Sequence, residues 1–347
     1  MNQSILINTA LIAIILFVLI QGLVYGKSFF IILAFSALIA FLVNPIARYL
    51  EQRGFSRAAS SIISVIMIIL SVLLFFAFAS VQIAIHGSEI FHIEENVLLK
   101  IQAFENLIRQ KLHGYHFIIP HFGWLFKAVA YQVKDIVSLI PTVLITLVLI
   151  ILYVFFLLYY RSKLQHFMLM RASKDNKEAI QETIERIGIT ISDYLSGVLL
   201  VIVMLIVFYS LSLSLLGINA PILWSVIAGI LHIIPYIGIV VGAFFPLVIA
   251  LAVKGSIASA VGVCIVFAFA VIIESNILTP YIMGSKIHVN PLALITAVML
   301  GNTIWGIAGL ILAVPLMGIL KVIFDHVESF APYSYLISNH GSNHKTR

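Results

Sequence analysis

Long apolar segments that carry no charge constrain this chain more than any other feature. The first occupies residues 5–25, where no acidic or basic side chain occurs. A helix of that length, at about 1.5 Å per residue, spans about 30 Å, the thickness of a bilayer's hydrocarbon core. Because no Lys or Arg precedes the segment and it is longer than the apolar part of a signal peptide, we expect a retained membrane helix.

Composition supports lipid as the main solvent. Hydrophobic residues make up 62% of the 347 residues and charged residues only 10%, far less charge than a soluble surface needs. The net charge of +6 lies mainly in short loops between apolar segments, which indicates membrane topology rather than nucleic-acid binding. The single cysteine, Cys264, excludes an intrachain disulfide or a cysteine metal cluster.

The apolar segments predict about eight transmembrane helices in an all-α, polytopic membrane protein. They lie near residues 5–26, 28–47, 58–86, 137–160, 189–216, 221–253, 255–280 and 291–324. Segment 221–253 is too long for one upright crossing and contains Pro235, Gly238, Gly242 and Pro246. We therefore expect broken or re-entrant segments in the carboxyl half, and leave open whether 221–253 is one kinked span or a hairpin.

The loops predict orientation. Residues 48–57 carry three arginines and one glutamate, and 161–186 carry six basic and four acidic residues, so both are expected in the cytoplasm. Segment 87–136 is balanced and is expected outside. Both termini are then cytoplasmic. The expected regions are 1–160 (four spans, with the outer segment 87–136), 161–188 (cytoplasmic and amphipathic), 189–325 (the transport path) and 326–347 (a cytoplasmic tail).

Two polar segments show helical periodicity. In 94–112 apolar residues recur at helical spacing, and from Asp175 onward Ile180, Ile184, Ile187 and Ile191 share one face. Asp175 with Glu178 forms a capping-box pattern. We interpret both as amphipathic connectors on the membrane or against a neighbouring subunit.

Two prolyl breaks interrupt the carboxyl half. Both contain Pro-Tyr-Ile followed by glycine: Pro235, Tyr236 and Gly238 in the first, and Pro280, Tyr281 and Gly284 in the second. Proline removes a helical hydrogen bond, glycine permits a bent backbone, and in lipid the freed groups need partners. We therefore expect 235–238 and 280–284 to be non-helical and to lie together around one cavity, as in transporter binding sites.

Glu274 is the only acidic residue between Asp193 and Asp325. A carboxylate within a membrane is unfavourable unless it is paired, hydrated or protonated. We interpret it as a proton- or substrate-linked group with Asn276 as its hydrogen-bonding partner. The alternative is a helix-end residue that reaches the interface or makes a structural bond.

Other candidates are weaker. His232 lies one turn before Pro235, but a lone histidine on an apolar face is usually a packing residue. Residues expected to pack or bend helices are Gly242, Pro246, Gly301, Gly306, Gly309 and Pro315, with the last three glycines expected on one helix. The chain lacks HExxH, GxSxG and nucleotide-binding loop motifs, so we expect neither an enzyme nor an ATP-driven pump, and no cofactor or metal.

The sequence resembles the autoinducer-2 exporter family of PerM-type permeases. The matching elements are "NP" at 44–45 with the basic loop after it, "FFLLYYR" at 155–161, "YLSG" at 194–197, "IPYIG" at 234–238, "NILTPYIMG" at 276–284, "NPLALI" at 290–295 and the glycines before Pro315. The resemblance covers nearly the whole chain and is densest in the carboxyl half. It adds Asn290 and Pro291 to the candidate path.

The resemblance implies an eight-span protein of the bacterial inner membrane that forms a homo-oligomer, a pentamer, with one path per protomer. Family members include an exporter of the signal autoinducer-2 and others assigned as sodium/proton antiporters. We expect a secondary transporter that exports a small polar molecule, driven by protons. The alternative is a monovalent cation/proton antiporter, since no motif in the chain separates the two substrates.

Overall fold

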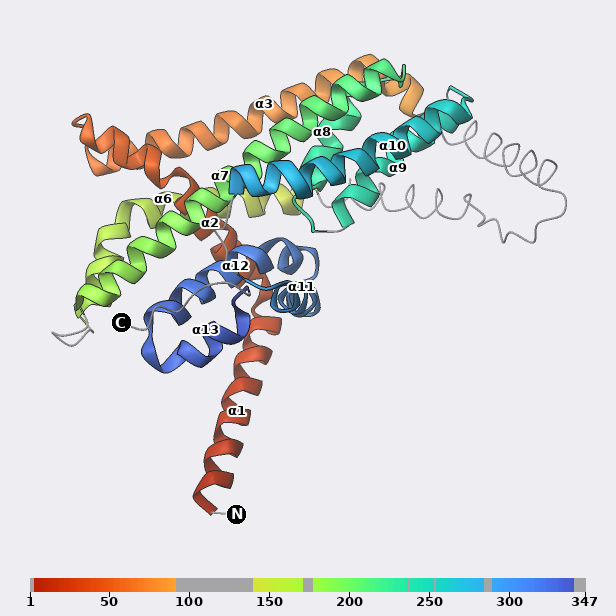
Figure 1. The fold of residues 1–347 in the computed structure, drawn as a ribbon. Helices are drawn as coiled ribbons and strands as arrows, with labels where there is room; N and C mark the ends of the chain where they lie inside the picture. The colour runs from red at the N-terminus through yellow and green to blue at the C-terminus, as the bar shows by residue number, and fades with distance from the viewer. Residues whose placement is uncertain are drawn as a thin grey trace. The chain divides into compact units, whose positions relative to one another are not determined.

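The computed structural model describes residues 3–91, 140–170, 177–235, 237–252, 254–283 and 289–339. Within these ranges the chain is helical apart from turns and one isolated β-bridge, between Val289 and Ser338 (Figure 1). It divides into two compact units. Unit 1 comprises Met1–Met67, Thr146–Ser196 and Ser285–Arg347, and unit 2 comprises Ile68–Ile145 and Gly197–Gly284.

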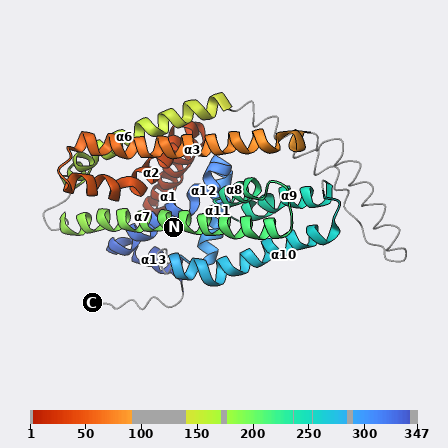
Figure 2. The same ribbon diagram turned by 90° about the horizontal axis from the view of Figure 1, so that it is seen from above.

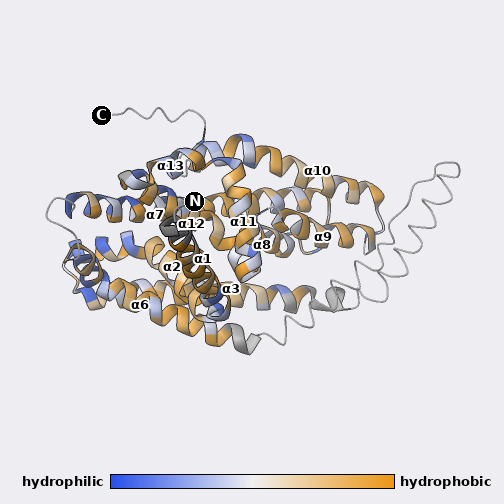
Figure 3. Cartoon of the chain, turned by 90° about the horizontal axis from the view of Figure 1, so that it is seen from below, coloured by the Kyte–Doolittle hydropathy of each residue, from blue (hydrophilic) through white to orange (hydrophobic). Residues whose placement is uncertain are grey.

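Six of the described helices are long and apolar enough to cross a membrane. They lie within α2 (Lys27–Gln52), α3 (Arg57–Phe91), α6 (Ile140–Met170), α7 (Lys177–Leu215), α10 with the π-helix η2 (Ile257–Ile273 and Glu274–Met283) and α12 (Ile307–His326). Apolar residues dominate these helices in the hydropathy view (Figure 3). The remaining helices are α1 (Gln3–Tyr25), α8 (Pro221–Leu231), α9 (Ile237–Ala252), α11 (Pro291–Trp305), η3 (Glu328–Phe330) and α13 (Ala331–Ile337).

The prediction of an all-α polytopic membrane protein is confirmed. Two of the eight predicted segments, 221–253 and 291–324, each contain a pair of helices, and the one from 58 extends to Phe91. The predicted helix at 94–112 and the capping residue Asp175 lie outside the described residues. Downstream, α7 begins at Lys177, and Ile191 of its apolar stripe is fully buried.

In unit 2, α8 and α9 form an antiparallel helical hairpin, which Figure 2 shows as neighbouring helices. Trp224 stacks on Phe245 with ring centroids 5.3 Å apart. Nearer the turn, a Cβ on Gly242 would come within 3.0 Å of Ala228, and one on Gly238 within 1.9 Å of the Leu231 carbonyl oxygen. Glycine is therefore required where the two arms meet. Since α8 has 11 residues and α9 has 16, each arm is shorter than a full crossing.

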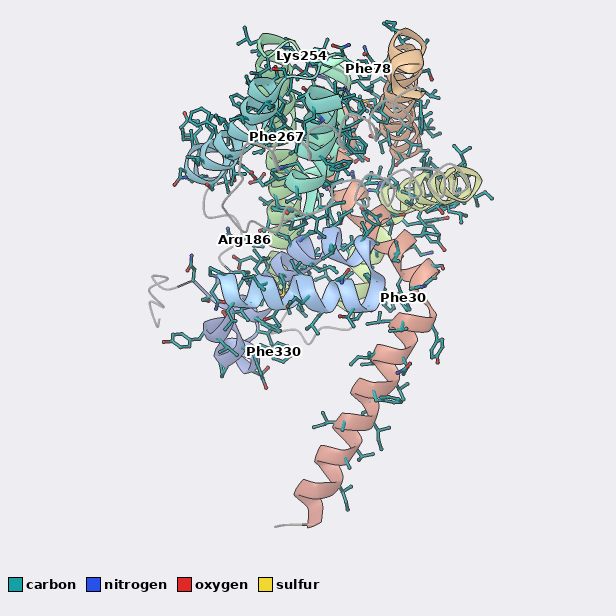
Figure 4. The ribbon with its side chains drawn as sticks, turned by 90° about the vertical axis from the view of Figure 1, so that its right-hand side faces the viewer. Phe30, Phe78, Arg186, Lys254, Phe267 and Phe330 are labelled. Atoms are coloured by element: carbon teal, nitrogen blue, oxygen red, sulfur yellow. The ribbon has the colours of Figure 1, made fainter. Side chains whose placement is uncertain are left out.

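The core of unit 2 lies between this hairpin, α7 and α10. Tyr209 of α7 stacks on Phe267 of α10 at 4.4 Å, and both side chains are buried. Figure 4 shows Phe267 among the helices of this unit. The buried cluster consists of Val201, Leu205, Tyr209, Leu213, Ile218, Ala220, Leu223, Trp224, Ala228, Ile249, Ala250, Ala260, Val263, Phe267 and Ala270.

In unit 1, α11 and α12 form a second hairpin, with Gly306 as the joint. Gly306 has φ +62°, a conformation that residues with a Cβ rarely adopt. Gly301 and Gly309 face each other so closely that a Cβ on Gly309 would lie 1.9 Å from the Gly301 carbonyl oxygen. The expectation that these three glycines lie on one helix was wrong, because Gly306 reverses the chain between them.

Short polar contacts hold the ends of unit 1. Trp305 Nε1 donates to the Leu23 carbonyl oxygen at 3.0 Å, which attaches α1 to the second hairpin. Asn290 caps α11 by accepting from the Ala293 amide at 2.8 Å, and it donates to the Leu336 carbonyl at 2.7 Å. It therefore joins the start of α11 to the end of α13.

Candidate functional site

The first sequence break is the turn of the α8–α9 hairpin. The His232 amide donates to the Ala228 carbonyl at 3.0 Å, and α9 begins at Ile237, whose amide donates to the Pro235 carbonyl at 2.7 Å. The expectation of a non-helical 235–238 was wrong for Ile237 and Gly238, which belong to α9. Pro235 lies in the turn, and Tyr236 lies outside the described residues.

The second break is a π-helix, η2, which continues α10 from Glu274 to Met283. The expectation that this segment is non-helical was wrong over 280–283, and Gly284 lies outside the described residues. A π-turn is wider than an α-turn and commonly marks functional sites. The wider turn gives the ring of Pro280 more room from the preceding turn, so the helix continues through the proline.

These two elements bring His232 and Glu274 together. The Nε2 atom of His232 lies 2.7 Å from the Glu274 Oε1 atom, although the residues are 42 positions apart in the sequence. His232 is the C-cap residue directly after α8, and Glu274 is the first residue of the π-helix. The pair therefore joins the tip of the hairpin to the point where α10 changes its hydrogen-bonding pattern.

The pair is largely shielded. The His232 side chain is 11% exposed and that of Glu274 is 23% exposed. The second ring nitrogen of His232, Nδ1, is buried and has no hydrogen-bond partner among the described residues. Tyr209 lies close enough to interact electrostatically with the Glu274 carboxylate. A buried polar atom without a partner is unusual, and it is available to a water, an ion or a solute.

An imidazole bonded to a carboxylate can bind and release a proton. Histidine is the side chain that most readily changes charge near neutral pH, and a carboxylate is its natural proton partner. Transfer of the shared proton between the two groups interconverts an ion pair and a neutral pair. In a low-dielectric setting the balance between these states is sensitive to any charge that arrives nearby.

Asn276 does not take the role expected of it. Its amide donates to the Ile272 carbonyl at 2.9 Å and to the Ser275 hydroxyl at 3.1 Å, both on its own helix. Among the described contacts, Glu274 is bonded to His232 instead. Tyr281 is 91% exposed and Pro280 is exposed, so both lie on the outer face of η2 in the single chain.

The other candidates belong to packing contacts. Pro246 is fully buried within α9, and Pro315 is buried within α12. Asn290 and Pro291 form the start of α11 in unit 1, where the Asn290 side chain serves as cap and tether. Their expected place in the transport path stays a prediction.

The structure also shows polar clusters that sequence reasoning missed. Lys321 on α12 is buried and is bonded to Asp325 and, at 3.2 Å, to the Ser334 hydroxyl of α13. In a second cluster, Arg161 donates to Asn44 at 2.7 Å and pairs with Glu51. The motifs "NP" and "FFLLYYR" contain Asn44 and Arg161, but no spacing in the chain shows that the two meet.

The described helices define a polytopic all-α membrane protein. A model of the family "AI-2E family transporter" matches residues 10–329, and the chain belongs to that family. The resemblance stated from the sequence motifs is thereby confirmed.

Several curated proteins are similar to the chain. "Putative transport protein YrrI" of Bacillus subtilis is 35% identical over 138 residues, 40% of this chain and 38% of that protein. A "Putative transport protein" of Borreliella burgdorferi is 26% identical over 189 residues, 53% of this chain and 52% of the relative. "Putative transport protein YueF" of Bacillus subtilis is 23% identical over 329 residues, 90% of this chain and 87% of YueF. The matched part thus spans about half or less of the first two relatives and most of the third.

Proposed function

We propose that the protein is a secondary transporter that exports a small polar molecule of the autoinducer-2 kind and couples export to proton movement through His232 and Glu274. The contact of 2.7 Å between these side chains is the observation that carries the proposal. Membership of a transporter family supports the general class.

The coupling follows from charge balance at the site. With the carboxylate ionised and the imidazole protonated, the two groups satisfy each other. A polar solute that donates hydroxyl hydrogen bonds to Glu274 competes with the proton for the ionised carboxylate. A proton that arrives from outside neutralises Glu274 and releases the solute, and loss of that proton to the cytoplasm restores the carboxylate for the next solute. The unpartnered Nδ1 atom of His232 supplies one further polar contact to a solute on that side of the ring.

The runner-up proposal is monovalent cation/proton antiport. Carboxylate and carbonyl oxygens are the ligands that hard cations prefer, and Glu274 begins a π-helix, whose carbonyls have altered partners. In this mechanism the cation and the proton compete for the same carboxylate. Neither mechanism needs a cofactor, and both describe a transporter rather than an enzyme.

Proteoliposomes test the proposal. Efflux of a radiolabelled polar solute and of sodium is measured with and without an imposed pH gradient. We expect the wild type to move one of them faster with the gradient, and Glu274→Gln, which cannot cycle a proton, to lose that acceleration. Glu182→Gln makes the same chemical change on an exposed residue and should behave as wild type.

Gradient-dependent movement of sodium but not of the solute would replace the first proposal by the second. A Glu274→Gln protein with the wild-type rate and pH dependence would show that the carboxylate is structural.

A further inference from the structure

A second site lies in unit 1, where arginines gather around the turn between α2 and α3. Arg48, Arg53 and Arg57 belong to residues 48–57, in which Glu51 is the only acidic residue. Arg161 reaches the same place from α6 and pairs with Glu51. We call these four arginines the basic cluster.

The backbone of the turn is fixed. The Gly54 amide donates to the Glu51 carbonyl at 3.0 Å and the Phe55 amide to the Leu50 carbonyl at 3.2 Å, and Gly54 has φ +93°. This is the Schellman pattern that ends many helices with a glycine. Ser56 then caps α3 by accepting from the Ala59 amide at 3.2 Å. The arginines before and after the turn are therefore held by ordered backbone.

The cluster carries more positive charge than its own carboxylate neutralises. Glu51 is paired with Arg161, whose guanidinium also donates to Asn44 at 2.7 Å. The charges of Arg48 and Arg57 both act on Arg161, so the three guanidinium groups lie within electrostatic range. Three guanidinium groups around one carboxylate repel one another, and an added anion would relieve that repulsion.

The surroundings indicate the source of the anion. Tyr49 is 53% exposed and Phe55 is 47% exposed, so aromatic side chains flank the arginines. Arg53 donates to the Tyr49 hydroxyl at 2.6 Å and lies over its ring. The cluster also lies at the ends of two helices long enough to span a membrane. Arginines with aromatic residues at helix ends are typical of the level of lipid headgroups.

We propose that the basic cluster binds the phosphate of an anionic phospholipid, with Arg48 and Arg57 as its main ligands and the Glu51–Arg161 pair as the support that positions them. Guanidinium groups suit this role because each can donate two parallel hydrogen bonds to phosphate oxygens. The exposed aromatic side chains would lie beside the acyl chains, which a free phosphate ion lacks.

Native mass spectrometry of the full-length protein in zwitterionic detergent tests this site. The protein is titrated with phosphatidylglycerol and, separately, with phosphatidylcholine. We expect clear preference for phosphatidylglycerol and about 30-fold weaker binding by the double variant Arg48→Gln/Arg57→Gln, since each basic residue near a membrane surface contributes about fivefold. The double variant Arg48→Lys/Arg57→Lys keeps the charge but loses the paired hydrogen bonds, so its binding should fall between that of the wild type and that of Arg48→Gln/Arg57→Gln.

Arg186→Gln is the matched control, because it removes one charge from an exposed arginine of the same unit, shown in Figure 4. Equal binding of both lipids would overturn the proposal. So would wild-type affinity in the double glutamine variant or an equal loss in the Arg186 control. Displacement of phosphatidylglycerol by millimolar inorganic phosphate would assign the cluster to a free anion instead.

Discussion

His232 and Glu274 each have a polar atom that water would otherwise satisfy, and their contact replaces part of that hydration. Because the two side chains are only 11% and 23% exposed, removal of one leaves the other poorly solvated. The losses in the free energy of unfolding caused by the two truncations should therefore be non-additive, since the second truncation removes a group that has already lost its partner.

A double-mutant cycle measures this coupling. We expect His232→Ala and Glu274→Ala each to lower the free energy of unfolding in mixed micelles by about 1–3 kcal/mol. The double variant should lose clearly less than the sum, which gives a coupling energy of about 1–3 kcal/mol. Unfolding is followed by circular dichroism against denaturing detergent.

Glu182→Ala is the control for this cycle. Its pair with Arg186 is long, 3.9 Å, and both side chains are more than half exposed. Glu182→Ala should therefore change the free energy of unfolding by no more than about 0.5 kcal/mol. Additive losses at His232 and Glu274 would mean that the contact is absent in the folded protein.

At the scale of elements, the α8–α9 hairpin depends on glycine at one point of closest approach. In Gly238→Ala the added methyl group would meet the backbone of Leu231 and His232, which cannot move as a side chain can. We expect a loss of about 1–3 kcal/mol or more in stability, with lower transport because the His232 turn shifts. Thermal unfolding and efflux are measured on the same preparation.

Gly22→Ala makes the same change in α1, where nothing lies within 4 Å of the added atom. Since alanine favours helix over glycine, this control should be neutral or slightly stabilising. A stable, active Gly238→Ala protein would contradict the tight hairpin.

The presence of the long helices could be predicted from the sequence, because a long uncharged segment in lipid must satisfy its backbone hydrogen bonds internally. The backbone conformation at the two prolyl breaks could not be predicted. A proline predicts an interruption of the α-helical pattern, but the pattern does not say whether the chain turns back, as at Pro235, or widens into a π-helix, as at Pro280. The sequence likewise does not show whether the chain turns at Gly306, because the turn depends on the close contact between Gly301 of α11 and Gly309 of α12.

The candidate site was predictable only in part. Glu274 stands out as an isolated acid, and His232 as a polar residue beside a break. That they bond each other depends on a hairpin which reverses the chain between them. Asn276 lies nearer in sequence but turns toward its own helix. The Arg161–Glu51 pair spans 110 positions and has no periodic signal at all.

For the whole molecule, the compact units do not follow the order of the chain. Unit 1 gathers three separate stretches and unit 2 two, with α3, α6 and α7 contributing residues to both. The expected homopentamer and the inner-membrane location stay predictions. Many large apolar side chains are exposed in the single chain, as expected of a surface covered by lipid or by further subunits.

The membrane topology is a property of the whole molecule. We expect residues 48–57 and 161–186 to face the cytoplasm and 87–136 to face outward, because basic residues concentrate in the first two segments. Cys264 is exposed and is first replaced by serine, so that each introduced cysteine is the only one. Single cysteines are then placed at Ser56, Ser173 and Gly114.

In intact cells an impermeant maleimide should label the cysteine at position 114 and leave those at 56 and 173 unlabelled. Permeabilised cells should show labelling at all three, which controls for burial; Ser56 itself is exposed in the structure. Labelling of position 56 from outside would invert the predicted orientation.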